Sequence, residues 1–242
     1  MKIIEIGHNH LGSRPRATAL VTKVLDSEAD ALTLQIRERE FYLGSPQYAL
    51  DPEFLTQTRI RSHSAGKSFG VALSDLSLLS LCEQLSVDFY KILSRDLENS
   101  EFLSNFRTDK KLYLSTGMSP LEAIDAAVDI VGKDNTLIHT SLSDNLEDMN
   151  IKAIQTMQEY FNMPIAYGNH CKDINATFAA LAFNPSDIFL YLKVADGTPC
   201  PDDAHAVTAR NLDSFLKSIC DVEKTIGNGV KCKLTDGIRG QK

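Results

Sequence analysis

The chain has 242 residues, 43% of them hydrophobic and 24% charged, so it can bury a large core without disulfides or a metal. Its net charge of −7 and its scattered Lys and Arg residues leave no basic stripe, which argues against nucleic acid as a partner. No apolar run reaches the ~18 to 20 residues of a membrane span, and no signal peptide opens the chain. We therefore expect a soluble cytoplasmic protein with no membrane partner.

Five cysteines are spread along the chain without a CxxC pair. This pattern differs from that of zinc sites and disulfide frameworks, and it suits a reducing compartment in which Cys packs as a small apolar residue. The length fits one domain, or two of ~100 to 150 residues each. The hydrophobic periodicity has to decide between them.

Short β-rich runs alternate with longer segments of helical period, and eight such alternations fill the chain. Most of the runs are almost continuously apolar, as expected for parallel strands that are buried on both faces. The expected strands are Lys2–Gly7, Ala31–Ile36, Phe69–Leu73, Asp88–Leu93, Lys111–Ser115, Thr136–Ser141, Pro164–Gly168 and Asp187–Val194.

The segments between these runs place apolar residues three and four positions apart, which predicts amphipathic helices. Strands that alternate with helices of ~10 to 15 residues indicate βαβ units, in either a closed barrel or an open doubly wound sheet. Eight units in this length favour the barrel, and the Gly7–Gly12 turn lacks the glycine spacing of a dinucleotide-binding fold. The predicted fold is therefore α/β, a single (β/α)8 TIM barrel over residues 1–242. The expected helices are Arg16–Asp26, Leu76–Leu85, Pro120–Val131, Met149–Phe161, Ile174–Leu181 and Leu212–Ile226.

The longest stretch without a regular pattern runs from Glu38 to Lys67 and includes Pro46, Pro52 and the polar residues around His63. It follows the second expected strand, so in a barrel it would lie at the mouth formed by the carboxyl ends of the strands. We expect a mobile lid there, with a plain surface loop as the alternative.

Active sites of such barrels lie at the carboxyl ends of the strands, and these ends are polar here. Lys91 is the most informative residue because it lies inside an apolar run, where a charge is costly unless it is paired or binds an anion. A single histidine taken alone is more often a surface or hydrogen-bonded structural residue. The polar residues at the expected strand ends include Glu5, Asn9, His10, Gln35, Ser94, Ser115, His139, Ser141 and His170.

Four motifs occur in order at these strand ends: Glu5–Gly12 (EIGHNHLG), Tyr90–Ser94 (YKILS), Ser115–Ser119 (STGMS) and Gly168–His170 (GNH). Together they resemble the sialic acid synthase (N-acetylneuraminate synthase) family, and the resemblance spans essentially the whole chain. Weaker similarities lie at Leu137–Ser141, Pro199–Asp202 and Glu223–Lys231.

The resemblance implies a barrel that condenses phosphoenolpyruvate with an open-chain amino sugar to form a nonulosonic (sialic) acid, with a divalent metal such as Mn or Mg. It also leaves a homodimer possible. It implies catalytic roles for Glu5 and Lys91, and metal binding by His170. The positions that it assigns to substrate binding are Asn9, His10, Gln35, Ser94, Ser115 and Ser141.

Three departures from the family pattern lead to further expectations. The second-strand Lys-Phe-Gln is Thr33-Leu34-Gln35 here, and the Glu-Lys-His-Phe of the last strand is replaced within Phe189–Lys193. The latter change removes the catalytic carboxylate and the second metal histidine, so we expect a weak metal site. We also expect that the family's small antifreeze-like C-terminal domain is absent.

Three interpretations of function follow. The chain is a synthase-type transferase with a reworked site, a catalytically impaired barrel that acts as a binding or regulatory protein, or a different aldolase or lyase on the same scaffold. Glu5 and Lys91 favour an enzyme, whereas the apolar last strand favours a binding protein.

Overall fold

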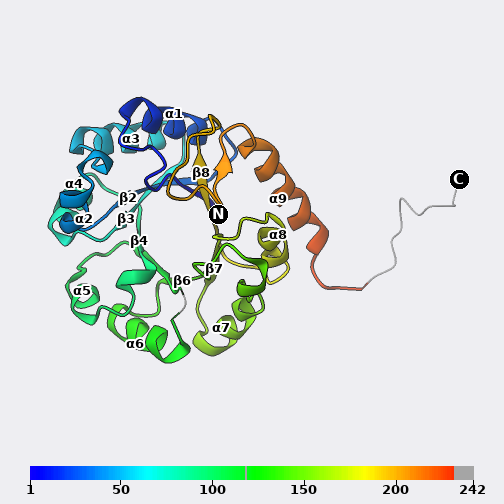
Figure 1. Cartoon of the computed structure of the whole chain (residues 1–242). Helices are drawn as coiled ribbons and strands as arrows, with labels where there is room; N and C mark the ends of the chain where they lie inside the picture. Colours follow the sequence, from blue (N-terminus) through cyan, green and yellow to red (C-terminus); the bar gives the residue numbers. More distant parts are fainter. Residues whose placement is uncertain (118, 232–242) are drawn as a thin grey trace, which may run out of the picture.

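A computed structural model describes residues 1–117 and 119–231. Its eight main strands are parallel, and each pairs with its neighbours in chain order. The ring closes because β1 (Lys2–Glu5) pairs with both β2 (Ala31–Ile36) and β8 (Ile188–Lys193). This confirms the predicted (β/α)8 barrel (Figure 1). The other strands of the ring are β3 (Ser68–Leu73), β4 (Phe89–Ile92), β5 (Lys111–Ser115), β6 (Thr136–His139) and β7 (Ile165–Gly168).

Helices surround the ring of strands on its outside (Figure 1). The short strand β9 (Val207–Thr208) pairs with the end of β8 and leads into the last helix. The outer helices are α1 (Arg14–Leu25), α3 (Pro52–Ser64), α4 (Leu79–Gln84), α5 (Ser100–Asn105), α6 (Leu121–Val131), α7 (Ala153–Phe161), α8 (Asn175–Leu181) and α9 (Leu212–Ile226). Short elements at the mouth and between units are α2 (Arg39–Gly44) and the 3-10 turns Pro46–Tyr48, Leu76–Leu78, Ser94–Asp96 and Leu146–Asp148.

The core has two layers. Most buried apolar side chains lie between the strands and the helices, while a smaller cluster fills the inside of the barrel. In that inner cluster the Tyr113 ring packs edge to face against Phe89 and Phe189, with ring centroids 5.2 and 5.1 Å apart. Side chains alternate along a strand, so the inward positions two residues later belong to the same interior, one layer closer to the mouth. The inner cluster comprises Ile3, Ala31, Phe89, Tyr113, Ile138, Ala166 and Phe189.

The expectation that Glu38–Lys67 lacks regular structure was wrong, while its role as a mobile lid stays a prediction. Most of this stretch is helical, and α3 is the outer helix of the second βα unit, with Phe54 and Leu55 buried. Asp51 caps α3, because its side chain accepts a hydrogen bond of 2.7 Å from the Phe54 amide. Pro52 is in the first turn of the helix, where a proline is tolerated because no intrahelical donor is lost.

Two smaller differences concern the start of one helix and the presence of another. The expected helix Met149–Phe161 starts later, as α7 at Ala153, and α5 was not predicted because its six residues are too few for a periodic pattern.

We expect limited proteolysis to be slow within Pro52–Ser64, with or without phosphoenolpyruvate, because cleavage there requires opening of the buried contacts of α3. Mass spectrometry of early fragments measures this. Rapid cleavage inside α3 that a ligand suppresses would support the lid interpretation.

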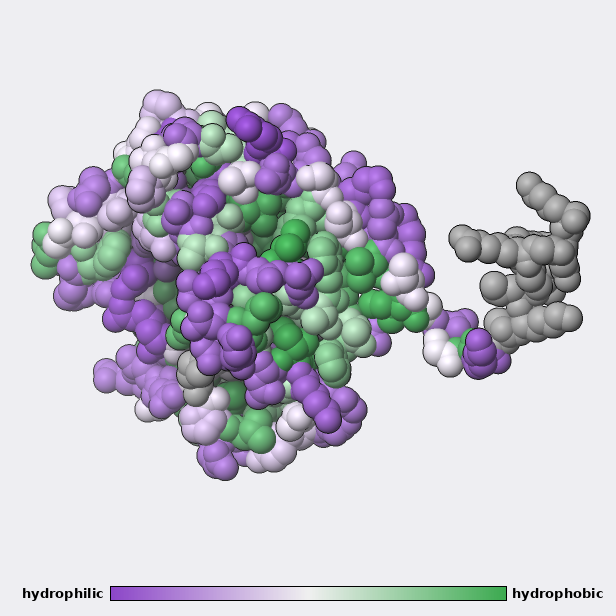
Figure 2. Space-filling model, turned by 45° about the vertical axis from the view of Figure 1, so that its right-hand side comes forward, coloured by the Kyte–Doolittle hydropathy of each residue, from purple (hydrophilic) through white to green (hydrophobic). Residues whose placement is uncertain are grey.

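The face that carries α8 and α9 has hydrophobic residues gathered among hydrophilic ones (Figure 2). Ile174, just before α8, is 46% exposed. Within residues 1–117 and 119–231, no helix has the length and apolar character needed to cross a membrane.

Candidate active site

A buried ion pair lies in the barrel interior, one layer above the inner apolar cluster. Glu5 and Lys91 are 0% and 3% exposed, and Lys91 Nζ lies 2.5 Å from Glu5 Oε2. Glu5 lies two residues after Ile3, and Lys91 two residues after Phe89, so both point inward. Pairing offsets much of the cost of burying the two charges. The structure thus brings together the two residues that the sequence predicted as catalytic.

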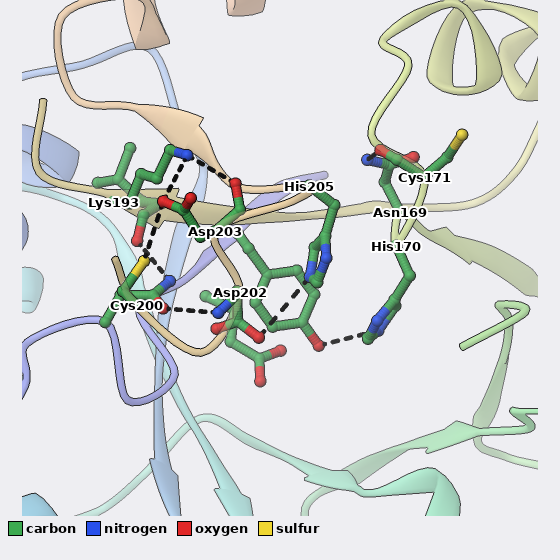
Figure 3. Close-up of polar contacts among 12 residues, drawn as sticks. Asn169, His170, Cys171, Lys193, Cys200, Asp202, Asp203 and His205 are labelled. Atoms are coloured by element: carbon green, nitrogen blue, oxygen red, sulfur yellow. Dashed lines mark hydrogen bonds and ion pairs between the residues drawn. The ribbon is translucent and has the colours of Figure 1, made fainter. Parts of the chain in front are cut away.

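Tyr191 connects this pair to the histidine after β7. Lys91 donates a second hydrogen bond, of 3.1 Å, to the Tyr191 hydroxyl, which lies 3.3 Å from His170 Nε2. The imidazole of His205 lies beside that of His170, with ring centroids 4.6 Å apart. Figure 3 shows His170 and His205 coming from two different segments to the same place. Burial lowers the pKa of His170 to about 3 and that of His205 to about 4, so both rings are neutral near pH 7.

Asp202 comes from the segment between β8 and β9, which folds back over the mouth. Its amide donates to Asn9 Oδ1 at 3.1 Å, and its Oδ1 lies 3.7 Å from His205 Nε2 (Figure 3). Gly7 allows this close approach: a Cβ at that position would lie 2.7 Å from Asp202 Oδ2. Burial, aided by the negative charge of Glu5, raises the pKa of Asp202 to about 7.

Neither Asp202 nor His205 was among the predicted site residues. The one signal for them was the weak similarity at Pro199–Asp202, directly after the last strand. Spacing along the chain could not show that this segment returns to the first strand.

Two predicted hydroxyls meet at the same end of the barrel. Ser115 ends β5, Ser94 follows β4, and their Oγ atoms are 2.9 Å apart. Gly117 makes room for them, because a Cβ there would lie 2.7 Å from Ser94 Cβ. Met118 of this motif lies outside the described residues. The strands of Lys91 and Ser115 are neighbours, so a cation and two hydroxyls occupy adjacent strand ends.

The other predicted residues lie in two places: Asn9, His10 and Gln35 near the turn after β1, and Ser141 with His139 in a separate cavity. Asn9 uses its amide to hold the β8 side of the barrel, donating 2.9 Å to the Leu192 carbonyl and accepting from the Asp202 amide. His10 accepts a 3.1 Å hydrogen bond from the Gly12 amide and packs near Tyr48. The Gln35 amide oxygen lies near Gly7, as does Asp202.

Ser141 and His139 belong to a neighbouring cavity of about 430 Å³, between the segments that follow β5 and β6. Ser141 contacts Met149 Sδ at 3.5 Å, and His139 Nε2 lies 2.9 Å from the Met149 carbonyl oxygen.

A larger cavity, of about 530 Å³, opens between the segment after β7 and the start of α9. His205 and Lys193 line it, and Lys193 is itself paired with Asp203 at 2.8 Å. Lys193 belongs to the stretch of the last strand that stands in place of the family's Glu-Lys-His-Phe. In this chain, the Lys193 ammonium forms a salt bridge with Asp203 at the rim of the cavity.

The resemblance implies a divalent metal, and the side chains present do not fit one. Among the described residues, no group of three or more His, Cys, Asp or Glu side chains is placed to hold a metal ion. The Nε2 atom of His170 already contacts Tyr191, and the Lys91 ammonium lies on the other side of that hydroxyl. A metal ion at His170 Nε2 would displace the Tyr191 hydroxyl and be repelled by the Lys91 ammonium.

The fold and the site together define a (β/α)8 barrel with a buried carboxylate–lysine pair and two hydroxyls at the carboxyl ends of its strands. A family model matches residues 21–231, and the chain belongs to the NeuB family.

Several known proteins are similar to the chain. The uncharacterized protein MJ1065 of Methanocaldococcus jannaschii is 28% identical, over 95% of this chain and 72% of that protein. An N,N'-diacetyllegionaminic acid synthase of Campylobacter jejuni is 26% identical, over 95% of this chain and 78% of the synthase. The crystal structure of an N-acetylneuraminic acid (sialic acid) synthetase from Leptospira borgpetersenii matches with a TM-score of 0.89 and 23% identity, covering 97% of this chain and 87% of that one.

Proposed function

We propose that this protein condenses phosphoenolpyruvate with the open-chain form of an amino sugar to give a nonulosonic acid. Membership of the NeuB family supports a synthase-like role in sugar biosynthesis, and two relatives are N,N'-diacetyllegionaminic acid synthases. The observation that carries the proposal is the arrangement of Lys91, Ser94 and Ser115 at adjacent strand ends.

These groups suit an anion that carries phosphate and carboxylate. The Lys91 ammonium has three donors, of which Glu5 and Tyr191 take two, so one remains for a ligand. The two serine hydroxyls can each donate to an anionic oxygen, and hydrogen bonds to charged oxygens are among the strongest in proteins.

In the proposed reaction, C3 of phosphoenolpyruvate forms a bond to the aldehyde carbon of the sugar, and the aldehyde oxygen takes up a proton. Water then adds to C2, and cleavage of the C2–O bond releases inorganic phosphate and leaves a 2-keto acid. This chain lacks the last-strand carboxylate, and Tyr191 and Asp202 are two groups at its mouth that can carry a proton.

The test is calorimetry with phosphoenolpyruvate, followed by detection of phosphate and product with N-acetylmannosamine and related amino sugars. We expect Ser94→Ala/Ser115→Ala to weaken phosphoenolpyruvate binding roughly tenfold or more, since two hydrogen bonds to a charged ligand are lost. Ser80→Ala, at an exposed position of α4, is the matched control and should bind as the native chain does. No binding by the native chain, or equal binding by the double variant, contradicts the proposal.

A second candidate is a binding or regulatory protein that has kept the anion pocket. The observation that favours it is Tyr191, a buried phenol in the stretch of β8 where the family carries its catalytic carboxylate. Phosphoenolpyruvate binding without phosphate release, for every amino sugar tried, would select this candidate over the synthase.

A further inference from the structure

Lys91 has the surroundings of an amine nucleophile. Its Nζ atom lies 2.5 Å from Glu5 Oε2, 3.1 Å from the Tyr191 hydroxyl and 5.2 Å from the centre of the Phe189 ring. A carboxylate this close weakens the attraction of the ammonium for an anion, but an amine nucleophile needs such a group to accept its proton. Lysines in apolar surroundings catalyse reactions by forming Schiff bases with carbonyl substrates.

The layer of the barrel around Lys91 contains polar atoms without a partner. Among the described residues, Glu5 Oε1 and Thr33 Oγ1 are buried and make no hydrogen bond. Thr33 is the neighbour of Glu5 in the β1–β2 register, and it lies two residues after Ala31 of the inner cluster, so it points inward. Buried polar groups are normally paired, so these two oxygens suit contact with a polar ligand.

A route to this layer passes His205. The His205 ring packs against the Tyr191 ring, with centroids 4.8 Å apart, and it also lines the cavity of about 530 Å³. The His205 imidazole thus lies between that cavity and Tyr191. Lys91 is 3% exposed, so the segment that carries Asp202 and His205 has to move when a ligand enters.

The hydroxyls of Ser94 and Ser115 indicate the class of ligand. Ser94 follows the strand of Lys91, Ser115 ends the neighbouring strand, and both hydroxyls can donate to a carboxylate. A 2-keto acid such as pyruvate has a carboxylate for these hydroxyls and an adjacent carbonyl carbon for the amine.

We propose that Lys91 forms an imine with a 2-keto acid, which gives this barrel an enamine-forming activity in addition to the proposed condensation. Glu5 takes a proton from Nζ, and Nζ forms a bond to C2 of the keto acid. The keto oxygen leaves as water, with the proton held by Glu5 and a second one from Nζ, and the third proton stays on the imine nitrogen. Glu5 then takes a proton from C3 to give an enamine, the form that adds to an aldehyde. This activity does not rest on the proposed function, since it needs no phosphoenolpyruvate.

The experiment uses pyruvate as the probe. The native chain is incubated with pyruvate and cyanoborohydride, which reduces an imine to a stable amine, and peptide mass spectrometry locates the adduct. We expect one adduct per chain, at Lys91. Lys91→Arg keeps a cation beside Glu5 but cannot form the imine, so it should carry no adduct. Lys111→Arg, at the exposed amino end of β5, is the matched control and should be modified at Lys91 as the native chain is.

A second readout follows the enamine. In deuterium oxide the native chain should replace the C3 protons of pyruvate with deuterium, which proton NMR measures, and Lys91→Arg should lose this exchange. Glu5→Gln should slow the exchange roughly 100-fold or more, because the proton acceptor is gone. Adducts on surface lysines without one at Lys91 in the native chain, or exchange that survives Lys91→Arg, would overturn the proposal.

The outcome is distinguishable from that of the proposed function. An adduct at Lys91 without phosphate release from phosphoenolpyruvate and any amino sugar supports the imine and contradicts the synthase. Phosphate release without an adduct at Lys91 supports the synthase and overturns the imine.

Discussion

Replacing Lys91 with Met is expected to lower the free energy of unfolding by about 3–5 kcal/mol, because it leaves the Glu5 carboxylate buried without a partner. Both side chains are almost fully buried, at 4% and 1% exposure, so water cannot compensate. Urea unfolding of the native and variant chains at pH 7 measures this loss of free energy of unfolding, provided that the two chains unfold with the same m-value. The affinity for phosphoenolpyruvate should fall as well, because the Lys91 ammonium that we propose binds this anion is absent.

A second variant separates the stability effect from the binding effect. In Glu5→Gln/Lys91→Met both charges are absent, so most of the lost stability should return while phosphoenolpyruvate binding stays weak. If the double variant is as unstable as Lys91→Met, the uncompensated carboxylate is not the cause. If it binds phosphoenolpyruvate as the native chain does, Lys91 does not contact the anion.

Stability is expected to fall steeply as the pH drops from about 6.5 to about 4. Burial lowers the pKa of His8 and of His10 from 6.5 to about 4, and the same cause acts on His170 and His205. Between about pH 6.5 and pH 4 these histidines bind protons in the unfolded chain but stay neutral in the folded chain, so acid favours unfolding. Each such ring contributes about 3 kcal/mol over the window, from ~1.4 kcal/mol for each pKa unit.

Asp202 acts in the opposite direction. Its pKa is raised to about 7, so the folded chain holds an extra proton between about 4 and 7, and the contribution of this carboxyl to stability declines as the pH rises. One carboxyl does not outweigh four buried imidazoles of comparable shift, so the net effect is loss of stability in acid.

Denaturant unfolding at several pH values tests this expectation. His10→Gln keeps a polar side chain at a completely buried position and removes one titrating group, so its stability should depend less steeply on pH between 6.5 and 4. A slope identical to that of the native chain would show that His10 is not kept neutral by burial.

The sequence by itself determined the barrel and the place of its central charge. Continuous apolar strands and amphipathic helices leave few arrangements that bury both kinds of surface, and eight such units close a ring. Lys91 was predictable because a charge inside an apolar strand must be paired or used, and the alternation of side chains points it inward.

The helix α3 shows where local patterns fail. Pro52 and the polar residues after it suggest a loop, yet proline also fits the first turn of a helix, and α3 buries only a narrow set of residues. The helix forms because Phe54 and Leu55 pack against the rest of the barrel. A local sequence pattern carries no information about that packing.

Only the tertiary structure decided the partners of Lys91 and the composition of the site. Glu5 lies 86 residues away in the chain and Tyr191 lies 100 residues away, and they meet because β8 pairs with β1 when the ring closes. Asp202 reaches the mouth because its amide bonds to Asn9, 193 residues earlier. These contacts join strands and loops that share no periodicity. Carboxylate, phenol and imidazoles therefore meet because the ring closes in three dimensions, and their spacing along the chain does not reveal it.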